Sequence, residues 1–125
     1  MSKSVIGEAE KKAVLKVLDK EYLGMGEEVS VFEKELSKIF NREAICVSSG
    51  TAAIQLAIEA CNIGYNDEVL VPSLTYVATF QAIKATGAKP VSCDINQETC
   101  LIDLKDVRSK INERTKAIIP VHYTG

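Results

Sequence analysis

The chain of 125 residues has no tryptophan, a single histidine and only three prolines, and its apolar residues form no long run. A membrane-spanning helix needs about 20 consecutive apolar residues. No such stretch and no signal-peptide pattern occurs, so we expect no membrane association. Positive and negative side chains are interspersed and nearly balance, with a formal net charge of −2. The sequence therefore lacks the basic surface that is typical of nucleic-acid binding.

Cysteine and histidine are too sparse and too widely spaced to predict a metal site. No two cysteines form a C-x-x-C pair, and His122 is the only histidine, which argues against a zinc site. Cysteine inside a strand-like segment behaves as a small hydrophobe, so we expect a reducing, cytoplasmic location. The cysteines are Cys46, Cys61, Cys93 and Cys100.

Residues 1–41 predict two N-terminal helices. Apolar residues recur every three or four positions from Ala9 to Leu18 and again from Val29 to Phe40, which is typical of amphipathic helices. Two glycines, Gly24 and Gly26, separate the two helical patterns.

Residues 42–125 show a different pattern, in which short runs rich in valine and isoleucine alternate with helical segments. Continuous apolar runs are typical of strands that are buried on both faces. Strand–helix–strand repeats predict right-handed crossovers and a mainly parallel sheet with helices on both faces, an α/β fold read as βαβαβαβ. We interpret residues 1–125 as a single partial domain. The expected strands are residues 44–47, 68–71, 90–94 and 116–122, and the expected helices are residues 51–61, 75–86 and 104–111.

Ligands in such sheets gather at the carboxyl ends of the strands, and Ser48, Ser49, Gly50 and Thr51 follow the first expected strand. The free amides of a helix start and the positive end of the helix dipole favour an anion such as a phosphate. Glycine permits close approach of the backbone. Thr51 is expected to cap the helix and to offer its hydroxyl. A plain helix cap without a ligand is the alternative interpretation.

Seven segments resemble the DegT-type family of pyridoxal-phosphate-dependent sugar aminotransferases, and they occur in the family's order and at its spacing. The resemblance implies the N-terminal part of the large domain of a fold type I transferase. The matching segments are residues 6–8, 32–36, 47–53, 67–73, 75–79, 87–91 with Asp94, and 114–122 with Gly125.

The resemblance assigns the cofactor pyridoxal 5′-phosphate to four residues. Gly50, Thr51 and Ala52 would hold its phosphate through backbone amides and the threonine hydroxyl. Tyr76 would stack on its pyridine ring, which agrees with the flat aromatic face that a delocalised ring needs. A partly buried aromatic residue at a helix start is the structural alternative for Tyr76.

Other polar residues receive lesser roles. His122 lies near the site in the family's pattern and is expected to support it without acting as acid or base. Asp67 and Glu68 are expected to flank a strand start as solvated or loop-bonding charges, with no catalytic role. The glycine turn at residues 23–26 resembles the family's turn near the sugar site.

The resemblance places the Schiff-base lysine and the carboxylate that faces the pyridine nitrogen beyond the segment that matches Gly125. Lys84, Lys89 and Lys116 fall at ordinary surface positions, so we expect no catalytic residue in this chain. The sequence also ends just after an expected strand. We therefore expect a fragment that is inactive alone.

On the resemblance, the full-length protein transfers an amino group from glutamate or glutamine to a keto group of a nucleotide-linked sugar, as a homodimer. A sugar dehydratase of the same family, which has a histidine in place of the lysine, is one alternative. A non-catalytic module that binds a phosphate or a partner is another. A nicotinamide cofactor is not favoured, because no G-x-G-x-x-G follows the first strand.

Overall fold

The computed structural model describes residues 4–124, which divide into two compact units, one ending at Cys46 and the other starting at Val47. The interpretation as a single partial domain stays a prediction. In chain order the elements are α1 (Glu8–Asp19), α2 (Glu27–Phe40), α3 (Gly50–Ala60), β1 (Glu68–Pro72), α4 (Val77–Ala85), β2 (Lys89–Cys93), α5 (Leu104–Lys110) and β3 (Thr115–Ile118).

The first unit contains α1 and α2, at the positions where the apolar spacing predicts helices. Helix α1 begins after Gly7, whose N–H donates to Glu10 Oε2 at 2.7 Å. Helix α2 ends at Asn41, which adopts a left-handed conformation with φ of 48°, and asparagine tolerates that conformation better than most residues. Neither helix has a buried side chain.

The strand that we expected at residues 44–47 does not form. The N–H of Ala44 donates to Ser37 Oγ at 2.9 Å, and the N–H of Cys46 donates to Glu33 Oε1 at 2.7 Å. Side chains of α2 thus accept hydrogen bonds from two backbone amides that would otherwise be available to pair with a neighbouring strand. The βαβαβαβ prediction is therefore wrong by one strand, since residues 47–124 hold three.

The three strands form a parallel sheet in the order β2-β1-β3. All five residues of the central strand β1 are buried, whereas β2 and β3 lie at the edges and are partly exposed. Burial on both faces is thus confirmed only for β1. Strand β3 is shorter than predicted. Ile119 donates one last backbone bond to Leu70 at 2.9 Å, and Pro120, having no N–H, cannot continue the ladder.

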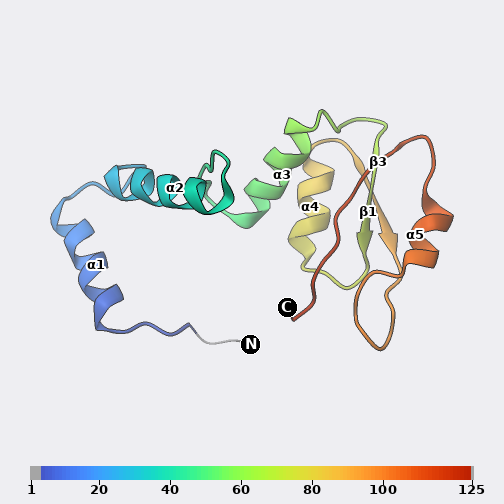
Figure 1. The fold of residues 1–125 in the computed structure, drawn as a ribbon. Helices are drawn as coiled ribbons and strands as arrows, with labels where there is room; N and C mark the ends of the chain where they lie inside the picture. The colour runs from blue at the N-terminus through green and yellow to red at the C-terminus, as the bar shows by residue number, and fades with distance from the viewer. Residues whose placement is uncertain (1–3, 125) are drawn as a thin grey trace. The chain divides into compact units, whose positions relative to one another are not determined.

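Helices cover both faces of the sheet, as predicted (Figure 1). On one face Val69 and Val71 of β1 pack with Ile58 of α3 and Ile83 of α4. On the other face Leu70 packs with Cys93 and with Val107 of α5. Each fully buried aliphatic side chain contributes about 1.5–3 kcal/mol to stability. Alternate residues of β1 therefore stabilise the two helical layers.

The amino-terminal edge of the sheet carries a buried carboxylate. Glu68, which we expected to be solvated or loop-bonding, is only 3% exposed. Its Oε2 accepts from Asn112 Nδ2 at 2.8 Å, and its Oε1 lies 2.8 Å from Arg114 Nη2 and 3.4 Å from Lys89 Nζ. The hydrogen bond from Asn112, with help from both cations, lowers the pKa of Glu68. The expectation of a solvated Glu68 is corrected because three donors converge on it.

Candidate functional site

A pocket of about 260 Å³ lies in the second unit, where α3 and α4 both begin. Gly50 and Thr51 come from the first turn of α3, and Tyr76 directly precedes α4. The structure thus brings together three of the four residues that the sequence assigns to a cofactor. The full lining is Gly50, Thr51, Ile54, Tyr76, Ala78 and Thr79.

Helix α3 is capped by Ser49, and not by Thr51 as we expected. Ser49 has an extended backbone, and its Oγ accepts from the Ala52 N–H at 3.1 Å. Thr51 lies two residues further on, inside the helix, so its hydroxyl is past the position from which an N-cap acts. The Ala52 amide is already bonded to Ser49 in this arrangement. The Thr51 hydroxyl and the amides that precede Ala52 remain available for a ligand.

Gly50 and Thr51 have backbone amides without a protein partner among residues 4–124. Such amides at a helix start carry partial positive charge and attract anions. A Cβ built on Gly50 would meet no atom within 4 Å. Packing within the described chain therefore does not require glycine at this position, whereas close approach of a ligand to the backbone would.

Tyr76 is the N-cap residue of α4 and has an extended backbone, with φ of −68° and ψ of 136°. Its side chain makes no capping hydrogen bond and is 79% exposed. The structural alternative of a partly buried aromatic residue does not describe this ring. A large exposed ring beside free amides provides an apolar face next to an anion site.

His122 does not line this pocket; it is exposed in the segment after β3. Asp94, which directly follows β2, is bonded within its loop: its N–H donates to Asp106 Oδ2 at 2.7 Å, and its carbonyl accepts from the Asp103 N–H at 2.8 Å. Asp67 behaves as predicted, because its Oδ2 accepts from the Gly64 N–H at 3.0 Å.

Two residues of this region were not predicted from the sequence. Ser49 was missed as the cap, although a serine three residues before Ala52 is the usual spacing for an N-cap bond. Thr79 was missed as a pocket residue. Its only signal was the spacing of four residues from Thr75, whose Oγ1 lies 3.0 Å from Thr79 Oγ1.

Among the residues that the structure describes, no cluster of three or more histidine, cysteine or acidic side chains could hold a metal ion. Within the same residues, no helix combines the length and apolar character needed to cross a membrane.

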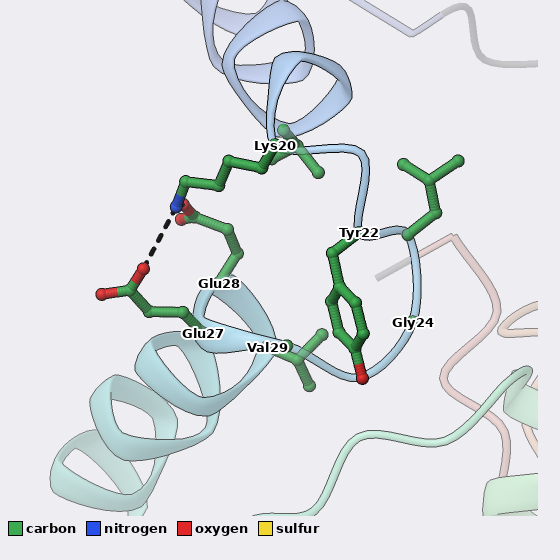
Figure 2. A pocket seen from close by; sticks show the side chains of 9 residues that line it. Lys20, Tyr22, Gly24, Glu27, Glu28 and Val29 are labelled. Carbon is green, nitrogen blue, oxygen red and sulfur yellow. Dashed lines mark hydrogen bonds and ion pairs between the residues drawn. The ribbon is translucent and has the colours of Figure 1, made fainter.

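The glycine turn of the first unit borders a separate pocket of about 380 Å³, between the end of α1 and the start of α2. Figure 2 shows Lys20 extending toward Glu27 and Glu28, to which its Nζ lies 3.1 and 2.8 Å distant. A Cβ on Gly26 would lie 2.8 Å from the Tyr22 ring. Packing against Tyr22 therefore accounts for Gly26, and a role of this turn near a sugar stays a prediction.

The sequence matches the DegT/DnrJ/EryC1/StrS aminotransferase family over residues 4–125. The chain belongs to this family. Its three-stranded parallel sheet with helices on both faces corresponds to the N-terminal part of a fold type I aminotransferase.

Several solved structures superimpose on the chain. An aminotransferase from Psychrobacter cryohalolentis is 30% identical with a TM-score of 0.89, over 100% of this chain and 32% of that one. Spr1654 from Streptococcus pneumoniae, named as a sugar aminotransferase and solved in its PMP form, is 35% identical with a TM-score of 0.84, over 93% and 30%. The GDP-4-keto-6-deoxy-D-mannose-3-dehydratase of E. coli, with bound hydrated PLP, is 30% identical with a TM-score of 0.84, over 95% and 32%. The chain thus spans about a third of the length of the structures that it matches.

The chain therefore belongs to a family of aminotransferases, and structures similar to it have been solved in a PMP form and with bound hydrated PLP. The pocket fits pyridoxal phosphate in three respects. Two amides are free at a helix start, Gly50 leaves open space above them, and the Tyr76 ring borders the same pocket.

Proposed function

We propose that the polypeptide to which this chain belongs is a pyridoxal-phosphate-dependent aminotransferase of nucleotide-linked keto sugars. Residues 47–124 would hold the cofactor's phosphate. The observation that carries the proposal is the pocket that joins the free amides of Gly50 and Thr51 to the ring of Tyr76.

Each residue of the pocket has a defined task in this proposal. The Gly50 and Thr51 amides donate to the phosphate, and the Thr51 hydroxyl adds a third donor. Tyr76 lays its ring against the cofactor's ring and excludes water from one face. Once bound, pyridoxal phosphate supplies an electron sink that weakens bonds at the carbon carrying the amino group.

The substrate, donor and assembly follow from the similar structures and the family resemblance. The sugar enzymes among the similar structures favour a sugar substrate. A nucleotide-linked keto sugar as amino acceptor, glutamate or glutamine as donor, a homodimer and a cytoplasmic location are proposals that rest on the family resemblance. The lysine that forms the Schiff base would belong to a part of the polypeptide outside these residues.

A sugar dehydratase is the second candidate, because the E. coli dehydratase superimposes on this chain with the same TM-score, 0.84, as Spr1654. Both enzymes would need the same phosphate site, so residues 47–124 do not distinguish them. Amino transfer consumes glutamate stoichiometrically with the keto sugar, whereas dehydration releases water from the sugar. Measuring 2-oxoglutarate and the amino sugar together separates the two.

The cofactor assignment is tested by titrating the purified full-length protein with pyridoxal phosphate and following its absorbance. Thr51→Ala and Tyr76→Ala should each raise the dissociation constant. We expect about 10- to 150-fold for the threonine, because a hydrogen bond to a charged group contributes about 1.5–3 kcal/mol and each 1.4 kcal/mol is a factor of ten in a dissociation constant. Wild-type affinity in both variants would refute the phosphate site.

A further inference from the structure

Helix α4 begins without an ordinary cap. Helix α3 is capped by Ser49, and α5 is capped by Asp103, whose Oδ1 accepts from the Lys105 N–H at 2.7 Å. The equivalent position of α4 is Tyr76, whose phenol makes no capping bond. Serine, threonine, aspartate and asparagine are strongly preferred at this position because a short side chain can reach the first-turn amides. The aromatic residue here thus replaces a capping residue.

Two hydroxyl groups that bracket Tyr76 are bonded to each other. Thr75 Oγ1 lies 3.0 Å from Thr79 Oγ1, and Thr79 is only 6% exposed. The Thr79 N–H also donates to the Tyr76 carbonyl at 3.0 Å. Thr79 therefore holds both Tyr76 and the residue before it, and this closes the first turn of α4 in the absence of a side-chain cap.

The Tyr76 ring has few contacts that could fix its direction, because 79% of it is exposed. Its direction is set mainly by the backbone at the N-cap position, from which the Cα–Cβ bond projects. Thr79 lines the same pocket as Tyr76, Gly50 and Thr51. A bond that fixes this backbone therefore also fixes where the ring lies along the pocket.

We propose that the Thr75–Thr79 hydroxyl pair is the device that positions Tyr76 over the cofactor pocket. The pair acts through Tyr76 and takes no part in chemistry, so Thr75 and Thr79 are positioning residues. This inference rests on the proposed function, because it assumes that the ring of Tyr76 contacts a bound cofactor.

The test measures the dissociation constant of pyridoxal phosphate, by absorbance titration, in variants of the full-length protein. Thr75→Val and Thr79→Val keep the side-chain shape and remove one hydroxyl each. Each should weaken binding about three- to tenfold, the effect of losing one hydrogen bond. The double variant should bind pyridoxal phosphate no more weakly than either single variant, because both hydroxyls take part in the same hydrogen bond. Thr79→Ser, which restores a hydroxyl, should recover most of the affinity.

A second double-mutant comparison tests whether the hydroxyl pair acts through the Tyr76 ring. Adding Thr79→Val to Tyr76→Ala should cause no further loss, since there is then no ring to position. Thr86→Val is the control at the other end of the same helix, where the Thr86 hydroxyl donates to the Ile83 carbonyl at 2.8 Å and accepts from the Ala88 N–H at 3.3 Å. It should destabilise α4 comparably and leave the affinity within twofold of wild type.

Three results would overturn the inference: wild-type affinity in Thr79→Val, equal losses in Thr79→Val and Thr86→Val, or fully additive losses in Tyr76→Ala and Thr79→Val. If Tyr76→Ala and Thr51→Ala bind poorly while Thr79→Val binds normally, only the positioning role fails. If Tyr76→Ala and Thr51→Ala themselves bind as wild type, the proposed function fails instead.

Discussion

Gly50→Ala should weaken cofactor binding without weakening the fold. The added methyl group would meet no protein atom within 4 Å, and Gly50 does not have a positive φ. Alanine is the better helix former, so the free energy of unfolding should stay unchanged or rise by at most about 1 kcal/mol. Because a Cβ points toward the N-terminus of its helix, the methyl group would occupy the space in front of the free amides.

The expected loss of affinity follows from the bonds that this methyl group displaces. A hydrogen bond to a charged group contributes about 1.5–3 kcal/mol, and each 1.4 kcal/mol is a factor of ten in a dissociation constant. If the methyl group moves the phosphate off one of the two amides, pyridoxal phosphate should bind about 10- to 150-fold more weakly. Pyridoxal, which has no phosphate, should bind the variant and the wild type equally.

The assay compares titrations with pyridoxal phosphate and pyridoxal, beside thermal unfolding of the apoprotein. Gly87→Ala is the opposite control, because Gly87 has φ of +85°, follows the C-terminal end of α4 and does not line the pocket. A left-handed alanine costs about 1–2 kcal/mol, so this variant should lose stability and keep its affinity. Unchanged binding of pyridoxal phosphate by Gly50→Ala, or an equal loss with pyridoxal, would refute the reasoning.

Three further predictions concern the fold. Ile83→Ala should lower the free energy of unfolding by about 2–5 kcal/mol, measured in urea, because Ile83 is fully buried between α4 and the sheet. Ser49→Ala should cost about 1 kcal/mol by removing the cap of α3, and a change within error would contradict the capping role. The pKa of Glu68 is lowered from its ordinary value of 4.5, so its stabilising effect is full at neutral pH and is lost as the pH falls through the folded-state pKa. Glu68→Gln should therefore be less stable than the wild type at pH 7 and lose less stability on acidification. An equal decrease in the melting temperature of the two proteins between pH 7 and pH 3 would argue against this.

The sequence predicted most of the elements because their signals are local. The spacing of apolar residues predicted α1 and α2. The continuous apolar run predicted β1, which is buried because it lies between two helical layers. The strand expected at residues 44–47 failed because strand formation depends on a partner. Its amides bond to Glu33 and Ser37, and no pattern within residues 44–47 reveals that competition.

The site was predicted only in part, because some of its signals are local and others depend on distant residues. Gly50, Thr51 and Tyr76 were found from the motif and the family resemblance, and the structure places them around one pocket. Glu68 was expected to be a solvated or loop-bonding charge. Its burial was not predicted, because its three donors lie 21, 44 and 46 positions further along the chain. Contacts at such separations depend on the register of the sheet, which single-sequence patterns do not specify.

Departures from local rules distinguish two residues of the proposed site from the structural residues around them. Gly87 is explained by its positive φ and Gly26 by the Tyr22 ring, whereas Gly50 has neither reason. Tyr76 occupies an N-cap position that a tyrosine cannot serve. Natural sequences break local rules mainly where function requires it. The two residues that the fold does not explain line the same 260 Å³ pocket, and the simplest account of both is a bound group with an anionic end and a flat ring.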